Sequence, residues 1–421
     1  MPSATARHVL GAGSRSLEAL VRHSSNVTDG SRGRARATHE RHVRHVLVFS
    51  GAAVLVVVAA LGAGFAASIS RTASSQDRGS CTGNARCVST ASKAAPLAPL
   101  SVVSTTPAPG AANVPSDTGV TVDFSVPVRQ GSPSPTLSPA VPGSWEVNGR
   151  TMVFSPAAPF VPFVTYTLTV PGGNGGVVAT DGERLGATDA VTFAIAPGSV
   201  TRLQQLLAQL GYLPLSYSDP LPAPPPPELA LPQPGSLSWR WSGLPPQLTS
   251  QWTPGVQSEI TKGAIMSFET QNGLGVDGIA GPQVWSALLA DAMTGKANTR
   301  PVSYVLVTKT LPEHLTVWVD GVLTFSDVPC NTGVQGATTP DGSFAVFEHV
   351  PVSNMRGTDI TGTSYDVTVP WASYFTGGDA LHGYPRAAYG FPQSNGCVEM
   401  QIPTAGKVWP DTPIGTLVTV Q

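Results

Sequence analysis

The residues best suited to do chemistry in this 421-residue sequence are a cysteine and a histidine near its C-terminal end. Cys397 stands in the stretch FPQSNGCVEM, and His382 lies fifteen residues earlier in GGDALHGYP. A thiol with an ordinary pKa of about 8.5 is mostly protonated at neutral pH. A neighbouring imidazole can take that proton, and the sulfur can then attack a carbonyl carbon and form a thioester. The pair therefore predicts a cysteine nucleophile with a histidine base.

Few other residues compete for the role of base. Residues 70–421 contain three histidines, which are His314, His349 and His382. His314 begins the expected strand HLTVWV, where a structural role is more common, and His349 could face either side of its strand. Gly383 follows His382 and permits close approach by a substrate. His382 is therefore the predicted base, and Gly383 is predicted to contact substrate.

The turn before the cysteine is the expected place for an oxyanion site. A tetrahedral intermediate needs N–H donors that are positioned in advance. Gly396 lets the backbone turn tightly, so its amide and that of Cys397 could point at one spot. Gly396 is the predicted oxyanion donor, and Ser394 is predicted to support the turn.

Other roles for Cys397 stay open on the residues alone. A zinc site would need several ligands at characteristic spacing, and only Glu399 lies nearby in the sequence. A disulfide with Cys330 is conceivable in an oxidising compartment. Otherwise Cys330 is best interpreted as a small buried residue. No metal or organic cofactor is expected.

The residues around the cysteine predict a β-rich C-terminal domain at 302–421. The segment SYVLVTK alternates apolar and polar residues, as a half-buried strand does. HLTVWVDGVLTFSDV predicts a hairpin about Asp320-Gly321, a dipeptide that favours a type I′ turn. A further turn is expected at Pro340-Asp341-Gly342.

Residues 198–296 predict a small three-helix module. Its first helix has one apolar face, formed by Leu203, Leu206, Leu207 and Leu210. Helical patterns resume at 260–274 and at Pro282, which suits a first helical position. Between the first two helices, residues 214–235 contain nine prolines. Proline disfavours regular helices and central strands, so this segment is expected to be an exposed insertion.

Residues 100–197 predict a β-sandwich. Segments such as GVTVDFSVPV, TMVFSP and VTYTLTV alternate at period two between Gly- and Pro-rich turns. The layout resembles bacterial immunoglobulin-like domains, which usually serve as spacers. The segment contains no catalytic constellation.

The first hundred residues predict a membrane anchor. Residues 1–45 carry eight arginines and three acids, and residues 46–69 carry no charge. At about 1.5 Å per residue the apolar run can cross a hydrocarbon core of about 30 Å. The flanking arginines predict a cytoplasmic N-terminus and a single-pass protein whose remainder lies outside the cytoplasmic membrane. A cleaved signal peptide is the alternative. Residues 70–99 are expected to be a flexible linker in which Cys81 and Cys87 form a local disulfide.

The composition limits the possible partners and folds. Charged residues make up 12% of the chain, with 44 Gly, 40 Pro and a formal net charge of −2. Such a composition is typical of short strands and turns. The near-neutral charge gives no indication of a nucleic-acid partner, and the length allows two to four domains.

One stretch carries a specific family resemblance. LHGYPRAAYGFPQSNGCVEM resembles the active-site signature of the L,D-transpeptidases, the penicillin-insensitive cysteine enzymes of peptidoglycan cross-linking. That signature is a His-Gly, a loop of about this length, and Ser/Thr-X-Gly-Cys. Upstream, NTGVQGATTPDGSFAVFEHV resembles the family's strand–turn–strand with its Thr-Gly and Thr-Pro-X-Gly elements. The helical segments LQQLLAQLGYL and AIMSFETQNGLGVDGIAGPQVWSALL resemble the peptidoglycan-binding module of cell-wall enzymes.

The resemblance implies roles for several residues. It makes Cys397 the nucleophile, His382 the base, and Ser394 and Gly396 the residues that shape the turn. It implies attack on the third-residue carbonyl of a tetrapeptide stem and release of D-alanine. Transfer to the side-chain amine of diaminopimelate then gives a 3→3 cross-link. The implied partners are peptidoglycan stem peptides and glycan, and carbapenems are expected ligands.

Two positions depart from the family pattern. Asn395 stands where many members have a second histidine. Because asparagine can also donate a hydrogen bond, Asn395 is predicted to contact substrate. Glu399 stands where many members have an arginine that would contact a substrate carboxylate. Arg386 is a weak candidate to replace that arginine, and a solvated loop charge is the better expectation for it. An L,D-carboxypeptidase, an enzyme that attaches proteins to peptidoglycan, and a non-catalytic wall-binding scaffold remain alternatives.

Overall fold

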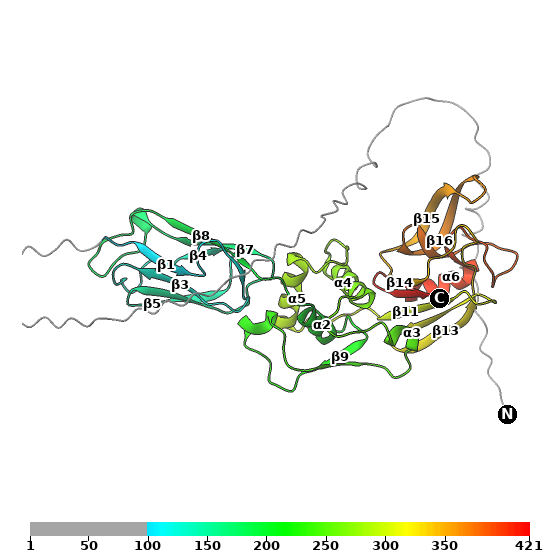
Figure 1. The fold of residues 1–421 in the computed structure, drawn as a ribbon, viewed down its shortest axis with the longest axis horizontal. Coiled ribbons are helices and arrows are strands. Elements are labelled where there is room, and N and C mark those ends of the chain that lie inside the picture. Colours follow the sequence, from blue (N-terminus) through cyan, green and yellow to red (C-terminus); the bar gives the residue numbers. More distant parts are fainter. Residues whose placement is uncertain (1–98) are drawn as a thin grey trace, which may run out of the picture. The chain divides into compact units, whose positions relative to one another are not determined.

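The computed structural model describes residues 99–421, and Figure 1 shows their fold. The predicted leader at 1–45, the anchor at 46–69 and the linker with its Cys81–Cys87 disulfide lie outside these residues, apart from residue 99. No helix within 99–421 is long and apolar enough to cross a membrane.

The N-terminal part of the described chain is the predicted β-sandwich. One sheet has the order β1 (Val102–Thr106), β3 (Val120–Phe124), β6 (Thr151–Pro156) and β5 (Gly143–Asn148). The other has the order β2 (Ala111–Val114), β8 (Asp189–Ile195), β7 (Thr165–Val170) and β4 (Thr136–Ser138). Alternate residues of β3 are buried between the sheets, as the period-two pattern requires. Phe160 packs edge-on against both Tyr166 and Phe193 in this core.

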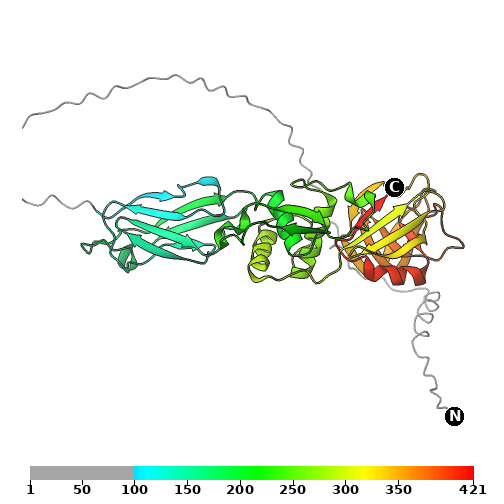
Figure 2. The same cartoon turned by 90° about the horizontal axis from the view of Figure 1, so that it is seen from below.

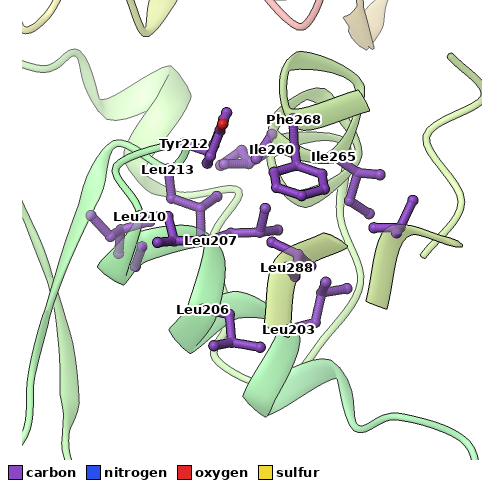
Figure 3. Close-up of a cluster of buried hydrophobic side chains, with 14 of the residues drawn as sticks. Leu203, Leu206, Leu207, Leu210, Tyr212, Leu213, Ile260, Ile265, Phe268 and Leu288 are labelled. Carbon is purple, nitrogen blue, oxygen red and sulfur yellow. The ribbon is translucent and has the colours of Figure 1, made fainter. Parts of the chain in front are cut away.

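Three helices form the next module. They are α2 (Val200–Gln209), α4 (Glu259–Asn272) and α5 (Pro282–Thr294), with the short α3 (Pro246–Thr249) before α4. Their apolar faces pack together, and Leu206, Phe268 and Leu288 are fully buried (Figure 3). Ser199 caps α2 by accepting the Arg202 N–H, and Pro282 begins α5. The predicted helical pattern is therefore confirmed.

The proline-rich segment is mostly exposed, as the sequence predicts, but it contains a strand pair and is bound to helix α2. Within it β9 (Leu215–Ser218) pairs with β10 (Ser236–Trp239), and a 3₁₀ turn, η2 (Pro226–Ala230), lies between them. The buried Arg202 donates from Nε to the Leu229 carbonyl at 2.8 Å. Gln205 donates to the Gln233 carbonyl at 2.6 Å and accepts the Gln233 N–H at 3.0 Å. Helix α2 therefore binds the segment through Arg202 and Gln205, two polar residues that are not part of its predicted apolar face.

The C-terminal domain contains two sheets (Figure 2), and its larger buried cluster includes residues from both. The first has the order β13 (Val322–Pro329), β12 (His314–Val319), β11 (Ser303–Thr308), β19 (Leu417–Val420) and β14 (Gly342–Ala345). The second has the order β15 (Glu348–Thr358), β16 (Ser364–Thr376), β17 (Asp379–Gly383) and β18 (Val398–Met400). Helix α6 (Ile402–Val408) and the 3₁₀ turn η3 (Trp409–Asp411) follow β18, and α6 contributes Ala405 and Val408 to the core.

Of the two turns predicted in this domain, the one at Asp320-Gly321 is present and the one at Pro340-Asp341-Gly342 is wrong. Gly342 already begins β14, and the turn lies earlier, at Gln335-Gly336, where the Ala337 N–H donates to the Val334 carbonyl at 2.9 Å. Asp320 and Gly321 both have positive φ, at 48° and 76°, as a type I′ turn requires. The hairpin of β12 and β13 therefore forms where the sequence predicts it. Tyr304 and Leu417, from β11 and β19, belong to the same buried cluster as the leucines of α2.

Replacement of Arg202 by alanine is expected to loosen the proline-rich segment. A hydrogen bond from a charged group contributes about 1.5–3 kcal/mol, and a loss of this size accelerates local exchange about tenfold or more. The amide hydrogens of Leu231 and Gln233 should then exchange faster, as measured by mass spectrometry. Glu228→Gln changes an exposed side chain of the same segment and should leave both amides at the native rate. Native exchange rates in Arg202→Ala would contradict this role.

Candidate active site

Cys397 and His382 come together on neighbouring parallel strands. Strands β17 and β18 pair Leu381 with Val398, and His382 with Glu399. Cys397 immediately precedes β18. Both Cys397 and His382 line one open cleft of about 630 Å³. The structure thus brings the predicted nucleophile and the predicted base to the same cavity.

Strand alternation decides which side chains face this cleft. Val398 and Met400 are buried in the domain core, whereas Glu399 between them lines the cleft with Cys397. On β17, Leu381 enters the core and His382 lines the cleft. A shift of either strand by one residue would exchange these faces. The register of β17 and β18 therefore fixes the composition of the site.

A tight turn presents the cysteine. Ser394 Oγ donates to the Cys397 carbonyl at 2.6 Å and accepts the Gly396 N–H at 3.1 Å. Gly396 has φ of +121°, which favours glycine, and a side chain there would collide with the Asp379 carboxylate. Ser394 thus lies inside the turn. The Gly396 N–H is already bonded, so the structure contradicts its predicted role as oxyanion donor. The Cys397 N–H has no acceptor among residues 99–421, which makes it the available donor.

Two buried threonines hold this turn from the segment after β13. Thr339 donates its hydroxyl to the Gly396 carbonyl at 2.7 Å and accepts the Gly333 N–H at 3.0 Å. Thr332 donates its N–H and its hydroxyl to the Glu313 carboxylate, both at 2.6 Å. The Thr332 carbonyl accepts the Ser394 N–H at 3.0 Å. Thr332 and Thr339 belong to motifs visible in the sequence, whereas nothing in the sequence pattern marks Glu313.

The thiol of Cys397 lies in a weakly polar environment. Its Sγ lies 3.9 Å from Met355 Sδ and 3.9 Å from the Gly378 carbonyl oxygen. Burial raises the pKa of Cys397 to about 12, and the charges of Asp379 and Glu399 act in the same direction. The resting cysteine is therefore a neutral thiol at neutral pH. Met355 and Asp379 also line the cleft, and no sequence motif marks them as site residues.

His382 is almost fully buried and is also neutral at rest. Its Nδ1 donates to the Gly383 carbonyl at 3.1 Å, which assigns the proton to Nδ1 and leaves the Nε2 lone pair free. Burial lowers the pKa of His382. Gly383 itself packs against α6, where a Cβ would come within 3.1 Å of Ile402 Cα. It is not among the residues that line the cleft, and its contact with substrate stays a prediction.

Arg386 forms a bidentate ion pair with the buried Glu399. Its Nε and Nη2 donate to the two carboxylate oxygens at 2.7 and 2.8 Å, and Nη2 also donates to the Gln393 carbonyl. The guanidinium also lies over the Tyr384 ring, 4.8 Å from its centroid. The expectation of a solvated loop charge is therefore wrong. A substrate carboxylate would have to compete with Glu399 for this arginine, whereas Asn395 is exposed at the cleft.

The remaining histidines and Cys330 lie outside the cleft lining. His349 stacks on Trp409 with ring centroids 4.1 Å apart, and burial lowers its pKa to about 4. His314 Nδ1 donates to the Pro312 carbonyl at 2.9 Å. Cys330 is fully buried and free, so the alternative of a disulfide with Cys397 is wrong. No group of three potential metal ligands occurs within residues 99–421.

Thr339→Val is expected to destabilise the C-terminal domain and to displace Cys397. The change keeps the shape of the side chain but leaves the Gly396 carbonyl and the Gly333 N–H without a partner. Each buried group left unsatisfied costs about 1–3 kcal/mol. Thermal unfolding should report a lower midpoint, whereas Thr338→Val, at an exposed neighbouring position, should match the native protein. Equal midpoints for the two variants would argue against this role of Thr339.

Alkylation of Cys397 by iodoacetamide should be slow at neutral pH and should keep rising with pH. Because the thiolate is the reactive form, the rate of a thiol with so high a pKa rises about tenfold per pH unit between about pH 7 and pH 10. Glutathione, with an ordinary thiol, should level off within this range. The background from other cysteines is measured in Cys397→Ala. A plateau at or below neutral pH would instead indicate a preformed thiolate–imidazolium pair.

Three family models match separate parts of the chain. They are a bacterial Ig-like domain at residues 97–194, a putative peptidoglycan binding domain at 246–288, and an L,D-transpeptidase catalytic domain at 303–420. The second match contains α3, α4 and the first half of α5 but not α2. The third contains both sheets of the C-terminal domain.

The solved structures that match the chain include several L,D-transpeptidases. An enzyme from Mycobacterium smegmatis is 15% identical, with coverage of 77% of this chain and 100% of its own, and a TM-score of 0.27. L,D-transpeptidase 3 from Mycobacterium tuberculosis, with a faropenem-derived adduct, is 15% identical, covers 76% and 97%, and also scores 0.27. The catalytic domain of the E. faecium enzyme, acylated by ertapenem, is 22% identical, covers 28% and 97%, and scores 0.25.

The family models carry the assignment, because these TM-scores are low. No curated protein matches the chain. The chain therefore contains an L,D-transpeptidase catalytic domain at residues 303–420, which follows a bacterial Ig-like domain and a peptidoglycan-binding module.

Proposed function

We propose that this chain is a cysteine transpeptidase that forms 3→3 cross-links in peptidoglycan. The observation that carries the proposal is the common cleft of Cys397 and His382, with the cysteine held in a hydrogen-bonded turn. The family match supplies the reaction class, transpeptidation. Because both side chains are neutral, they suit general-base catalysis, in which His382 takes the thiol proton while the sulfur of Cys397 forms its bond to the carbonyl carbon.

The first half-reaction acylates the enzyme. Cys397 Sγ attacks the carbonyl carbon of the third residue of a tetrapeptide stem while His382 Nε2 takes the thiol proton. The Cys397 N–H, which lacks an acceptor in residues 99–421, donates to the developing oxyanion. The amide bond to the terminal D-alanine then breaks. The leaving nitrogen takes the proton from His382, and a thioester remains on Cys397.

The second half-reaction transfers the acyl group. The side-chain amine of diaminopimelate on a neighbouring stem attacks the thioester carbonyl. A C–N bond forms, the C–S bond breaks, and a proton returns through His382 to the sulfur. Water in place of the amine would make the protein an L,D-carboxypeptidase, and a protein lysine would make it an attachment enzyme. The products of one assay separate these three outcomes.

Purified protein should form a covalent adduct of one carbapenem per chain. With a disaccharide-tetrapeptide it should release D-alanine and produce cross-linked dimers, both detected by mass spectrometry. Cys397→Ala should give neither adduct nor dimers. His382→Ala should acylate about a hundredfold more slowly, because a positioned base contributes about 10²–10⁴-fold.

Cys330→Ala is the matched thiol control and should retain the adduct, since Cys330 is buried outside the cleft. Reducing conditions keep Cys397 available. Unmodified native protein with unchanged tetrapeptide would refute the proposed activity. Binding of Cys397→Ala to insoluble peptidoglycan, measured beside it, reports how much of the function is adhesion.

A further inference from the structure

The three carboxylates of the active-site cleft differ in their partners. Its lining contains three carboxylates, from Asp359, Asp379 and Glu399. Glu399 is held by Arg386, and Asp359 accepts hydrogen bonds from Thr361 in its own turn. Asp379 has no hydrogen-bond or ion-pair partner among residues 99–421, and burial alone shifts its pKa. It is therefore the cleft carboxylate that stays available for a ligand.

The position of Asp379 is close to the reacting atom. It begins β17, in the same strand as His382, and its carboxylate lies against Gly396, the residue before Cys397. Asp379, Cys397 and Tyr365 line the same cleft, and the charge of Asp379 raises the pKa of both Cys397 and Tyr365. Burial raises the pKa of Asp379 to about 6, so it is an anion at neutral pH.

An anion at this position works against the first half-reaction. It disfavours the thiolate of Cys397, and it would repel the terminal carboxylate of a tetrapeptide donor. The second half-reaction has the opposite need. An acceptor amine is an ammonium at neutral pH, and it must approach the thioester and lose a proton before it can attack. An unpaired carboxylate beside the thioester attracts this cation.

We propose that Asp379 is the acceptor-binding residue, whose carboxylate holds the ammonium group of the acceptor beside the Cys397 thioester and so favours cationic amines over water. The inference rests on the proposed function, and it names the part of the cleft that selects the acceptor. It gives this chain a specificity residue that lies outside the cysteine–histidine signature.

The proton balance of the step follows from this placement. The ammonium gives one proton to the Asp379 carboxylate and becomes a free amine. The amine nitrogen attacks the thioester carbonyl, the C–N bond forms and the C–S bond breaks. The second amine proton passes through His382 Nε2 to the sulfur of Cys397. Asp379 then releases its proton to water, and the enzyme returns to its resting state.

The test compares two nucleophiles on the same acyl-enzyme. The full chain is mixed with the disaccharide-tetrapeptide donor and two acceptors, a diaminopimelate-containing tripeptide stem and hydroxylamine. Hydroxylamine is uncharged at neutral pH, whereas the stem amine is a cation. Cross-linked product, hydroxamate, hydrolysed donor and D-alanine are measured by mass spectrometry. Asp379→Asn should lower the ratio of cross-link to hydroxamate by about tenfold or more, because one charge-assisted contact is lost.

Acylation provides the internal control. Carbapenem adduct formation in Asp379→Asn should equal or exceed the native rate, since the change removes a negative charge beside Cys397. Asp379→Glu keeps the charge and should recover part of the preference for the cation. Asp359→Asn removes a cleft carboxylate that is bound within its own turn, and it should leave the ratio unchanged.

The outcomes separate the two claims. An unchanged product ratio in Asp379→Asn, with native acylation, would overturn the role of Asp379 and leave the transpeptidase proposal standing. An equal fall in cross-link and hydroxamate would show a merely structural effect and would also overturn it. Native protein that forms neither adduct nor D-alanine would overturn both claims.

Discussion

The position of Cys397 depends on one short turn, residues 393–397, which needs hydrogen bonds from residues distant in the sequence as well as its own. Gly396 adopts a backbone angle that favours glycine, and its carbonyl is buried. The Thr339 hydroxyl, 57 residues away in sequence, satisfies that carbonyl. Ser394 bonds both ends of the turn, and Thr332 anchors it to Glu313. These contacts place the thiol at the cleft while they leave the Cys397 N–H open, which is the arrangement that an oxyanion site requires.

The ionisable groups of the cleft differ in charge: Cys397 and His382 are neutral, whereas Asp379 is an anion. Burial keeps the thiol of Cys397 and the imidazole of His382 uncharged at rest. The Glu399 carboxylate, next to both, would oppose a thiolate more strongly if it stood alone, and Arg386 offsets its charge through two short hydrogen bonds. The ion pair thus offsets the charge of the glutamate that stands two residues after the nucleophile. Asp379 keeps its charge uncompensated, and this asymmetry motivates its assignment to the acceptor.

The sequence predicts those parts of the fold and site that local patterns encode. Strand alternation predicts both sheets of the sandwich, the leucine face predicts α2, and Asp320-Gly321 predicts a type I′ turn. The His-Gly and Ser-X-Gly-Cys motifs point to His382 and Cys397. The pairing of β17 with β18 then brings these two residues to the same cleft.

The remaining features depend on contacts between distant residues. Arg386 cannot be placed from its neighbours, since its partner Glu399 lies thirteen residues away. The prolines of 214–235 indicate an irregular segment, but only the structure shows that Arg202 and Gln205 bind it. The Gly396 N–H is occupied because the Ser394 side chain turns toward it. Asp379 becomes a candidate only because the structure shows no hydrogen-bond or ion-pair partner for it among residues 99–421. Such side-chain pairing leaves no periodic signal in a single sequence.

The central claim is that the acyl group passes through the sulfur of Cys397. The most direct measurement is an acid quench of the native protein during turnover of a tetrapeptide stem, followed by peptide mapping of the trapped intermediate. A tripeptide linked as a thioester is expected on the fragment that contains Cys397, and hydroxylamine should cleave this bond. D-alanine release with the acyl group on another residue, or with no covalent intermediate at any quench time, would contradict the claim.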